Sequence, residues 1–499
     1  MTFFYKFVNS IYKILPRTEG AEKKHSSHEK TDGPMKEIVR KDLQNYIESE
    51  KERMLDELFA LLRIPSISAV SAHRDDMRRM ADALVAKLLA AGADRACVME
   101  TGGHPAVMAE KILDPALPTV LVYGHYDVQP VEPLELWKNP PFDPIVRKTD
   151  LHPEGAILAR GANDDKGQMY MHVLAFEYMM RSGTLPCNVK FLIEGEEEAG
   201  SSHLDAFVRD HARELACDVV LVSDTTMAGK DQPSVMTGLR GLSYFEITVK
   251  GPSRDLHSGH FGGAVVNPCT ALCEMVAALH DESGRIAIPH FYDDVQEVSP
   301  QERQQMNALP LDMERYKANV GVSEVNGEEG YNTRERATIR PALDINGIWG
   351  GYTGEGAKTI LPAQAHAKIS IRLVPNQDPE KVNRAFVEHF KSLAPRGVEV
   401  EVIPTQGAYP YVTPVTGCAY QAAAEALTEV YGRPTVPVRG GGSIGVVPMF
   451  EKYLGRKTIL MGFGLDTDAI HSPNENYSLA QFYRGIESIV LFYRNFCRK

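Results

Sequence analysis

Five short segments rich in acidic residues and histidine constrain the fold of this chain more than any other feature. They cover residues 124–130, 161–167, 194–201, 223–224 and 470–475, and each follows an apolar run of strand length. In an open α/β sheet the carboxyl ends of parallel strands meet at one crevice, so residues far apart in sequence can gather there. The pattern therefore predicts an α/β fold in which a mostly parallel sheet, with helices on both faces, collects these segments into one site.

The gathered segments would bring many like charges together. The carboxylates concerned are those of Asp127, Asp164, Asp165, Glu197, Glu198 and Asp224. Like charges in a confined site raise each other's pKa, and burial adds a desolvation cost, so such a cluster needs cations to stay ionised. Two divalent metal ions would supply four positive charges. With His125 and His471 added, the mixed nitrogen and oxygen donors suit zinc first and manganese as an alternative.

Charge and cysteine usage narrow the function classes. The chain of 499 residues has 66 acidic against 54 basic residues, a net charge of −12, which disfavours nucleic acid as a partner. Its seven cysteines, an odd number without a C-x-x-C pair, predict reduced thiols and a cytoplasmic location. No run approaches the roughly 18 apolar residues of a membrane span. An interfacial helix within residues 1–17 is the alternative, but we expect residues 1–35 to be a disordered extension and linker without a membrane role.

The order of the expected elements predicts two domains. Between residues 36 and 241, strand-length runs alternate with helical stripes, which is the βαβ pattern of a catalytic α/β domain. From residue 242 to 407 the order becomes β-α-β-β-α-β, the ferredoxin-like arrangement, with residues 281–342 inserted after its first helix. The α/β pattern returns over residues 408–499. A smaller ferredoxin-like α+β domain, serving as a lid or for dimerisation, is therefore expected to interrupt the larger one.

Each segment taken alone has a plainer explanation. His125 and Asp127 could belong to a turn, or could form a metal-bound imidazole with the carboxylate that accepts its second N–H. Asp164 could cap a helix, or could bridge two metals through its two oxygens. Glu197 and Glu198 could lie on the surface, yet glycines on both sides at a strand end favour a general base next to a metal ligand. The joint occurrence of the five segments favours the metal site.

These motifs resemble those of metallopeptidase family 20, in the branch of the cytosolic non-specific dipeptidases and carnosine dipeptidases. The resemblance covers residues 36–499 and rests on GHYDVQP, GRGANDDKG, EGEEEAGS, DLHSGHFGG, GAKTILP, SIRLVPNQDP and AIHSPNE. It implies two metal sites that share one aspartate, His125, Asp164 and Asp224 at the first and Asp164, Glu198 and His471 at the second. It also implies that Glu197 is the general base, that Asp127 supports His125, and that the bond between Asp164 and Asp165 is cis.

The expected function is hydrolysis of dipeptides by a metal-bridging hydroxide, with Glu197 taking its proton. Arg372 lies on the polar side of an expected strand, where it could be a surface residue or a donor facing a cleft. By the resemblance, Arg372, Gly442 and Ser443 receive the free C-terminal carboxylate of the substrate, while His257 assists at the oxyanion. A homodimer is also expected, in which the domain of residues 242–407 supplies His257 to the site of the other subunit.

Two other functions stay open. The first is an N-acyl-amino-acid deacylase on the same di-metal site, which would accept an acyl group where a dipeptide carries its ammonium group. The second and more distant one is a catalytically inactive binding protein of this fold. That function predicts the loss of a ligand or of the base, and every matching position in the chain keeps its residue.

Overall fold

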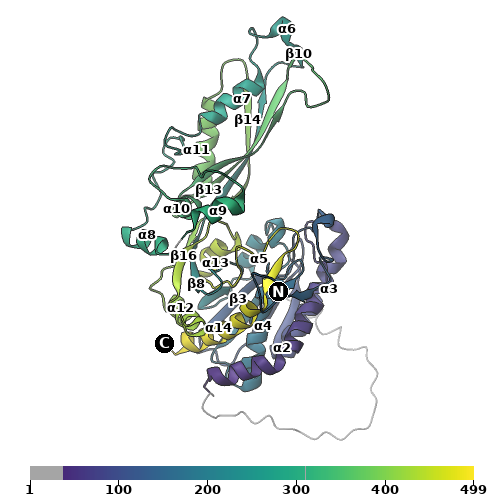
Figure 1. Cartoon of the computed structure of the whole chain (residues 1–499), viewed down its shortest axis with the longest axis vertical. Helices are drawn as coiled ribbons and strands as arrows, with labels where there is room; N and C mark the ends of the chain where they lie inside the picture. Colours follow the sequence, from purple (N-terminus) through teal and green to yellow (C-terminus); the bar gives the residue numbers. More distant parts are fainter. Residues whose placement is uncertain (1–36, 310, 499) are drawn as a thin grey trace, which may run out of the picture. The chain divides into compact units, whose positions relative to one another are not determined.

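The structure, a computed structural model, describes residues 37–309 and 311–498 (Figure 1). The expected extension of residues 1–35, with its alternative of a membrane-surface helix, lies outside these residues. No helix within the described ranges combines the length and the apolar character needed to cross a bilayer.

A nine-stranded sheet forms the centre of the larger part of the chain. Its order is β1-β2-β6-β3-β7-β17-β8-β15, with β16 beside β8. The strands are β1 (Arg95–Met99), β2 (Ala106–Lys111), β3 (Thr119–His125), β6 (Asn188–Glu194), β7 (Val219–Val222), β8 (Ser234–Leu239), β15 (Tyr411–Val412), β16 (Val436–Arg439) and β17 (Thr458–Leu460). The central strands β6, β3, β7 and β17 are parallel, whereas the outer pairs β1–β2, β2–β6, β17–β8 and β15–β8 are antiparallel. The parallel strands are the expected near-continuous apolar runs, buried on both faces.

Helices cover both faces of this sheet, which confirms the predicted α/β fold. One face packs against α2 (Arg40–Leu62), α3 (Arg74–Ala91), α4 (Lys166–Ser182), α12 (Cys418–Tyr431) and α14 (Leu479–Cys497). The other face packs against α5 (Leu204–Asp210) and α13 (Val446–Leu454). Helix α4 lies in the middle of its layer, between α2, α3 and α14, and is buried along almost its whole length. The residues just before α4 are therefore held on a rigid element.

A small sheet ties the last acidic segment to the rest of the site. It consists of β4 (Ile145–Arg147), β5 (Ala156–Leu158) and β18 (Asn476–Ser478), in the order β18-β5-β4. Strand β18 pairs antiparallel with β5, with Asn476 opposite Leu158. Because β18 follows residues 470–475 and β5 precedes residues 161–167, the pairing sets these two segments side by side.

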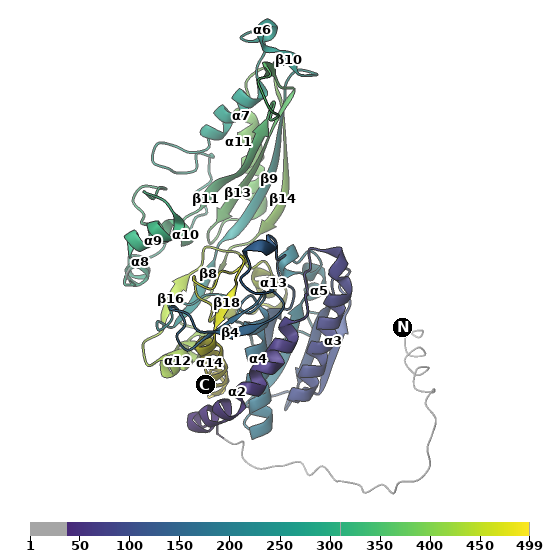
Figure 2. The same cartoon turned by 45° about the vertical axis from the view of Figure 1, so that its right-hand side comes forward.

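The residues between β8 and β15 build a second, four-stranded antiparallel sheet (Figure 2). It contains β9 (Gly241–Lys250), β11 (Ala342–Gly350), β13 (Gln364–Leu373) and β14 (Glu399–Ala408), in the order β11-β13-β9-β14. Helices α7 (Pro268–Ala277) and α11 (Pro379–Ser392) pack on one face around Phe245, Phe386 and Phe390. This is the expected ferredoxin-like order. The domain limits at residues 242 and 407 stay a prediction.

Short elements extend this second sheet at both ends. The inserted segment forms α8 (Pro300–Asn307), α9 (Met313–Val320) and α10 (Thr333–Thr338). Beyond the end of β9, β10 (Leu256–His257) pairs with β12 (Ile360–Leu361) and leads into α6 (Ser258–Phe261). The inserted segment contacts β16 through α8, whereas β10 lies beyond the far end of β9. Residues of β10, such as His257, are therefore separated from the residues near β16.

Candidate active site

The structure brings the five expected metal ligands together at the carboxyl ends of the central strands. His125 is the last residue of β3, and Asp164 stands just before α4. Glu198 lies in the turn after β6, and Asp224 lies two residues after β7. His471 comes from the loop before β18. For His125, Glu198 and Asp224 the gathering follows from parallel strand direction, as the sequence pattern predicts. Asp164 and His471 are brought in by the pairing of β5 with β18.

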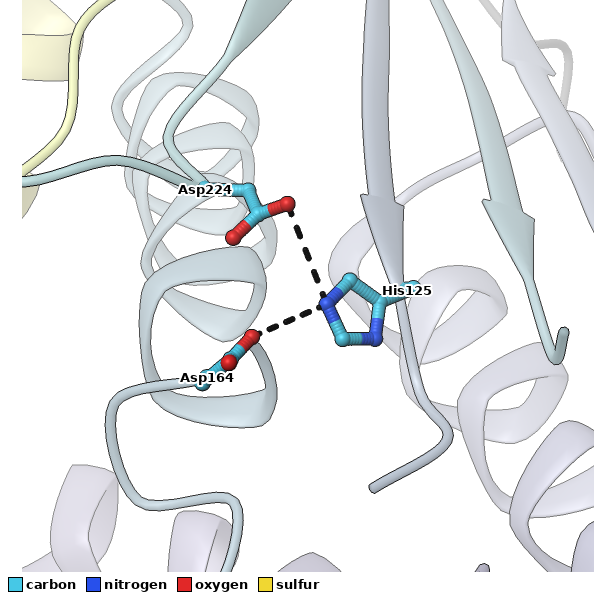
Figure 3. A group of neighbouring side chains, drawn as sticks. All are labelled: His125, Asp164 and Asp224. Carbon is cyan, nitrogen blue, oxygen red and sulfur yellow. Dashed lines mark hydrogen bonds and ion pairs between the residues drawn. The ribbon is translucent and has the colours of Figure 1, made fainter. Parts of the chain in front are cut away.

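One group of ligand atoms surrounds the buried imidazole of His125. Its Nε2 lies 3.1 Å from Oδ1 of Asp164 and 3.9 Å from Oδ2 of Asp224 (Figure 3). The three side chains offer one ligand atom each within 4.8 Å of one another. Side-chain exposure is 0% for His125, 12% for Asp164 and 15% for Asp224, so a bound cation would be largely shielded from solvent.

A second group shares Asp164 with the first. Nε2 of His471 lies 2.9 Å from Oδ2 of Asp164 and 3.1 Å from Oε2 of Glu198. Asp164 thus offers Oδ1 to one group and Oδ2 to the other, as a carboxylate that bridges two cations does. Gln129 donates a hydrogen bond of 2.7 Å to Oε2 of Glu198 and so orients this ligand.

The site carries more negative charge than it can hold without cations. Burial and the neighbouring charges of Asp165 and Asp164 raise the pKa of Asp224 well above its usual range. Burial, assisted by the charge of Glu198, raises the pKa of Glu197 to about 7. Three carboxylates and two imidazoles form a donor set that fits zinc or manganese.

Asp127 organises the turn that carries the two glutamates. Nδ1 of His125 lies 3.0 Å from the backbone carbonyl of Asp127 and 3.4 Å from its Oδ1. The Asp127 carboxylate accepts hydrogen bonds from the backbone N–H groups of Glu197 and Glu198, at 3.2 Å and 3.0 Å, and from Ser68 at 2.6 Å. The backbone carbonyl of Asp127 therefore supports His125, while its carboxylate fixes the backbone of Glu197 and Glu198.

The start of α4 shows no use of an aspartate as a capping side chain. Asp165 occupies the N-cap position without a side-chain capping hydrogen bond, and its Oδ2 accepts the backbone N–H of His125 at 3.1 Å. The bond between Asp164 and Asp165 is cis, as the resemblance implied. The helix-cap explanation of this motif is therefore not the arrangement that the structure adopts.

Glu475 holds the loop of Asp164 in place, a role that the sequence analysis missed. This fully buried carboxylate accepts hydrogen bonds from the backbone N–H groups of Gly161, Asn163 and Asp164 at 2.8, 2.9 and 3.1 Å. It also pairs with Arg160 at 2.9 Å. The available signal was an acidic residue directly before β18, inside a segment already chosen for its histidine.

Two arginines face the glycine-rich turn after β16. Nη1 of Arg372 donates to Oγ of Ser443 at 3.1 Å, and Arg240 donates through Nε to the carbonyl of Gly441 at 2.9 Å and through its backbone N–H to that of Gly442 at 3.1 Å. Burial lowers the pKa of Arg372, and burial together with the charge of Arg372 lowers the pKa of Arg240 to about 10. Neither guanidinium enters an ion pair with another residue of the described ranges. Such a pair suits an anion from outside the chain.

His257 lies far from these two arginines, in the separate two-stranded sheet of β10 and β12. Arg372 stands opposite Leu242, the second residue of β9, whereas His257 follows the other end of β9 and pairs with Ile360. Ten residues of β9 separate the two ends of the sheet, which is roughly 30 Å at 3.4 Å per residue. Hence His257 and Arg372 of the same chain cannot hold the same dipeptide.

Comparison with known proteins settles the family. The family model described as "Peptidase family M20/M25/M40" matches residues 121–495, three quarters of the chain. The chain belongs to this family. The curated Cys-Gly metallodipeptidase dug1 of Schizosaccharomyces pombe is 34% identical over 462 residues, which cover 89% of this chain and 96% of that protein. The Beta-Ala-His dipeptidase of Homo sapiens is 31% identical over 78% of this chain and 77% of that protein.

A solved structure supports the fold of this family member. The M20 family metallo-carboxypeptidase Sso-CP2 from Sulfolobus solfataricus superposes with a TM-score of 0.80 at 32% identity, covering 89% of this chain and 99% of that one. The predictions of an enzyme and of a metallopeptidase of family 20 are therefore confirmed. The roles of the individual residues stay predictions.

Proposed function

We propose that this chain hydrolyses dipeptides that have a free C-terminal carboxylate. The observation that carries the proposal is the position of Asp164, which offers one oxygen to each of two ligand groups. Glu197 precedes the proposed ligand Glu198 in the chain, Arg372 enters no ion pair within the described residues, and the named relatives are dipeptidases and a carboxypeptidase. The three features together fit cleavage of a single peptide bond near a carboxylate.

His125, Asp164 and Asp224 would hold one cation, and Asp164, Glu198 and His471 the other. We infer zinc, with manganese as the alternative, from the donor set. When bound, the cations polarise the scissile carbonyl and lower the pKa of the attacking water. The imidazole of His125 is oriented by Asp127 and that of His471 by the carboxylates beside it, so these ligands are positioned before a cation binds.

Glu197 is proposed as the general base. Its backbone N–H is fixed by Asp127, beside that of the proposed ligand Glu198, and a carboxylate next to an attacking water can both accept and return a proton. Glu197 would take the proton of the attacking water and deliver it to the leaving amine.

Arg372, Gly442 and Ser443 are proposed to receive the substrate's carboxylate. The guanidinium of Arg372 already has a fixed direction through Ser443, so little side-chain entropy is lost when the carboxylate binds. Arg240 adds positive charge behind the same turn. A neutral C-terminal amide would lose the charge-assisted part of this interaction.

We propose that His257 acts in the site of a second subunit of a homodimer. Its separation from Arg372 along β9 excludes a joint action within one chain. The sheet face opposite α7 and α11 carries exposed Trp349 and Ile403, which a second copy could cover. The seven cysteines, all unpaired, fit a reducing compartment such as the cytoplasm.

An assay of Ala-Ala against N-acetyl-Ala on the zinc-loaded and manganese-loaded protein tests the function. We expect turnover of Ala-Ala and little of N-acetyl-Ala. The reverse result would assign the site to a deacylase, and no turnover of either would favour a binding protein. The matched control is the Glu197→Gln protein, which keeps the ligands and lacks the base.

Mixing subunits tests the role of His257. His257→Ala and Glu197→Gln proteins should each be nearly inactive, while a mixed dimer contains one site with both residues intact. Co-expression should restore activity, to about a quarter of normal if subunits pair randomly. Dimers that form but stay at background would contradict the assignment of His257 to the other subunit's site.

A further inference from the structure

A large cavity adjoins the metal ligands and the glycine-rich turn. Its volume is about 560 Å³, within the roughly 300 to 1,000 Å³ typical of small-molecule sites. Asp224 lies at one part of its wall and Gly442 and Ser443 at another. The cavity is therefore continuous with both the proposed metal centre and the proposed carboxylate receptor.

Most of the remaining wall is apolar. The apolar side chains include Met236 and Leu239 of β8, and Met306, Leu309, Leu311 and Tyr316 of the inserted segment. An apolar wall beside a charged reaction centre binds an apolar group by the hydrophobic effect, without a demand for specific hydrogen bonds.

The inserted segment is fixed to the turn that holds the carboxylate receptor. Arg439, at the end of β16, donates two hydrogen bonds to Glu302 of α8, at 2.9 and 2.6 Å. The turn also touches α10, because a Cβ added at Gly441 would lie 2.4 Å from the carbonyl oxygen of Ala337. The wall of the cavity therefore has a defined position relative to Ser443.

The basic side chains of the wall are already satisfied. Nη1 of Arg334 donates to the carbonyls of Met306 and Leu309, at 2.7 and 2.6 Å, and so holds the loop between α8 and α9. Arg439 is paired with Glu302. Besides the ligand Asp224, the one remaining acidic side chain among the described wall residues is Asp466. The wall as a whole favours an uncharged guest, with Asp466 as the feature that could favour a cation.

Geometry decides which part of a dipeptide enters. Ser443 both accepts the hydrogen bond of Arg372 and lines the cavity, so a carboxylate bound by these two residues would lie beside the cavity, and the side chain of the C-terminal residue starts one atom further on. We infer that this cavity binds the side chain of the C-terminal residue, and that the enzyme prefers dipeptides in which this residue is large and apolar, such as leucine or phenylalanine. The inference rests on the proposed function and deepens it.

A panel of dipeptides tests the inference. On the cation-loaded protein, kcat/KM should be higher for Ala-Leu and Ala-Phe than for Ala-Gly by roughly 10- to 150-fold, the factor that full burial of such a side chain gives. Equal values would overturn the subsite. A preference for Ala-Lys over Ala-Leu would also overturn it and assign the cavity to a cationic side chain beside Asp466.

Two substitutions connect the preference to the cavity. Ala337 is exposed on α10 and lines the cavity, so Ala337→Phe fills the space without removing a packed side chain. It should lower kcat/KM for Ala-Phe at least tenfold and leave Ala-Gly within about twofold. Ala318→Phe, at an exposed position of α9 outside the wall, is the matched control and should change neither. Leu311→Ser, at a residue that is 38% exposed, should weaken Ala-Leu and spare Ala-Gly.

The remaining outcomes separate this inference from the proposed function. Equal losses for Ala-Gly and Ala-Phe in Ala337→Phe would overturn the subsite, and so would a loss confined to Phe-Gly, which carries the large side chain on the other residue. If no dipeptide were hydrolysed, the proposed function would fail. Calorimetry with the free amino acids would then still test whether the cavity binds an apolar side chain. Leucine should bind at least tenfold tighter than glycine, and equal affinities would overturn the inference.

Discussion

Glu475 offers a sharp test of how this site is held, because its whole contribution comes from contacts that span more than 300 residues of sequence. Its carboxylate lies at 0% exposure and accepts one guanidinium N–H and three backbone N–H groups. Burial nevertheless raises the pKa of Glu475, so desolvation outweighs the attraction of Arg160. The pair is therefore no large source of net stability, but each partner depends on the other.

Glu475→Gln keeps the size of the side chain and replaces one acceptor oxygen by an NH₂ group. Arg160 is then left as an uncompensated buried charge, and one or more backbone N–H groups lose their acceptor. Breaking a buried pair from one side costs roughly 3 to 5 kcal/mol. The free energy of unfolding at pH 7 should fall by about that amount. Because Asp164 loses the acceptor of its N–H, cation affinity should fall roughly 10- to 100-fold, as for other groups that orient ligands.

Urea unfolding in chelator measures the first effect, and competition with a chromophoric chelator measures the second. Glu388→Gln, at an exposed position of α11, is the matched control and should change both by little. The double variant Arg160→Met with Glu475→Gln should recover part of the lost stability, since no lone charge remains buried. A change below about 1 kcal/mol in Glu475→Gln, with unaltered cation affinity, would refute the reasoning.

Three further results are expected. Glu197→Gln should abolish turnover and keep two cations per subunit, whereas Asp164→Ala should lose both; equal metal content by elemental analysis would contradict the assigned roles. Amidation of a good substrate's C-terminus should lower kcat/KM by the equivalent of about 1.5 to 3 kcal/mol. Arg372→Ala should remove most of this difference. Kinetics of the free-acid and the amidated dipeptide, on both the unmutated protein and the variant, would check it. Hydrogen bonds from Arg303 lower the pKa of Glu335 to about 2, so this carboxylate stabilises the fold above its ordinary pKa and loses that effect as the pH falls through about 2. Glu335→Gln should therefore destabilise the protein at pH 7 and progressively less between pH 4 and 2, and a difference in unfolding free energy independent of pH would argue against it.

The sequence analysis recovered the elements whose signal is local. Buried parallel strands such as β3 and β6 show as continuous apolar runs, and the helical stripe of α4 follows from its periodicity. Short strands such as β8 and β16 were not anticipated, because six and four residues carry too little pattern. Helix α5 ends at Asp210, a boundary that apolar spacing alone does not fix.

Three of the ligands could be proposed from sequence because one physical rule, the convergence of parallel strand ends, applies to the segments after β3, β6 and β7, whereas the segments of Asp164 and His471 adjoin the small antiparallel sheet. His125 and Asp224 needed only their place after an apolar run, and the prediction did not depend on knowing their neighbours. Residue roles assigned by resemblance, such as those of Glu197 and Arg372, stay predictions that the geometry supports.

Tertiary structure alone decided how the site is supported and bounded. The role of Glu475 exists because β18 pairs with β5, and the place of His257 exists because β9 runs the length of its sheet. The cavity exists because the inserted segment is held to Arg439 through Glu302. None of these contacts leaves a periodic trace in the chain, because each depends on the packing of residues that are far apart in sequence. The sequence by itself thus determined which side chains could carry the chemistry, while the packing of distant segments determined what surrounds them.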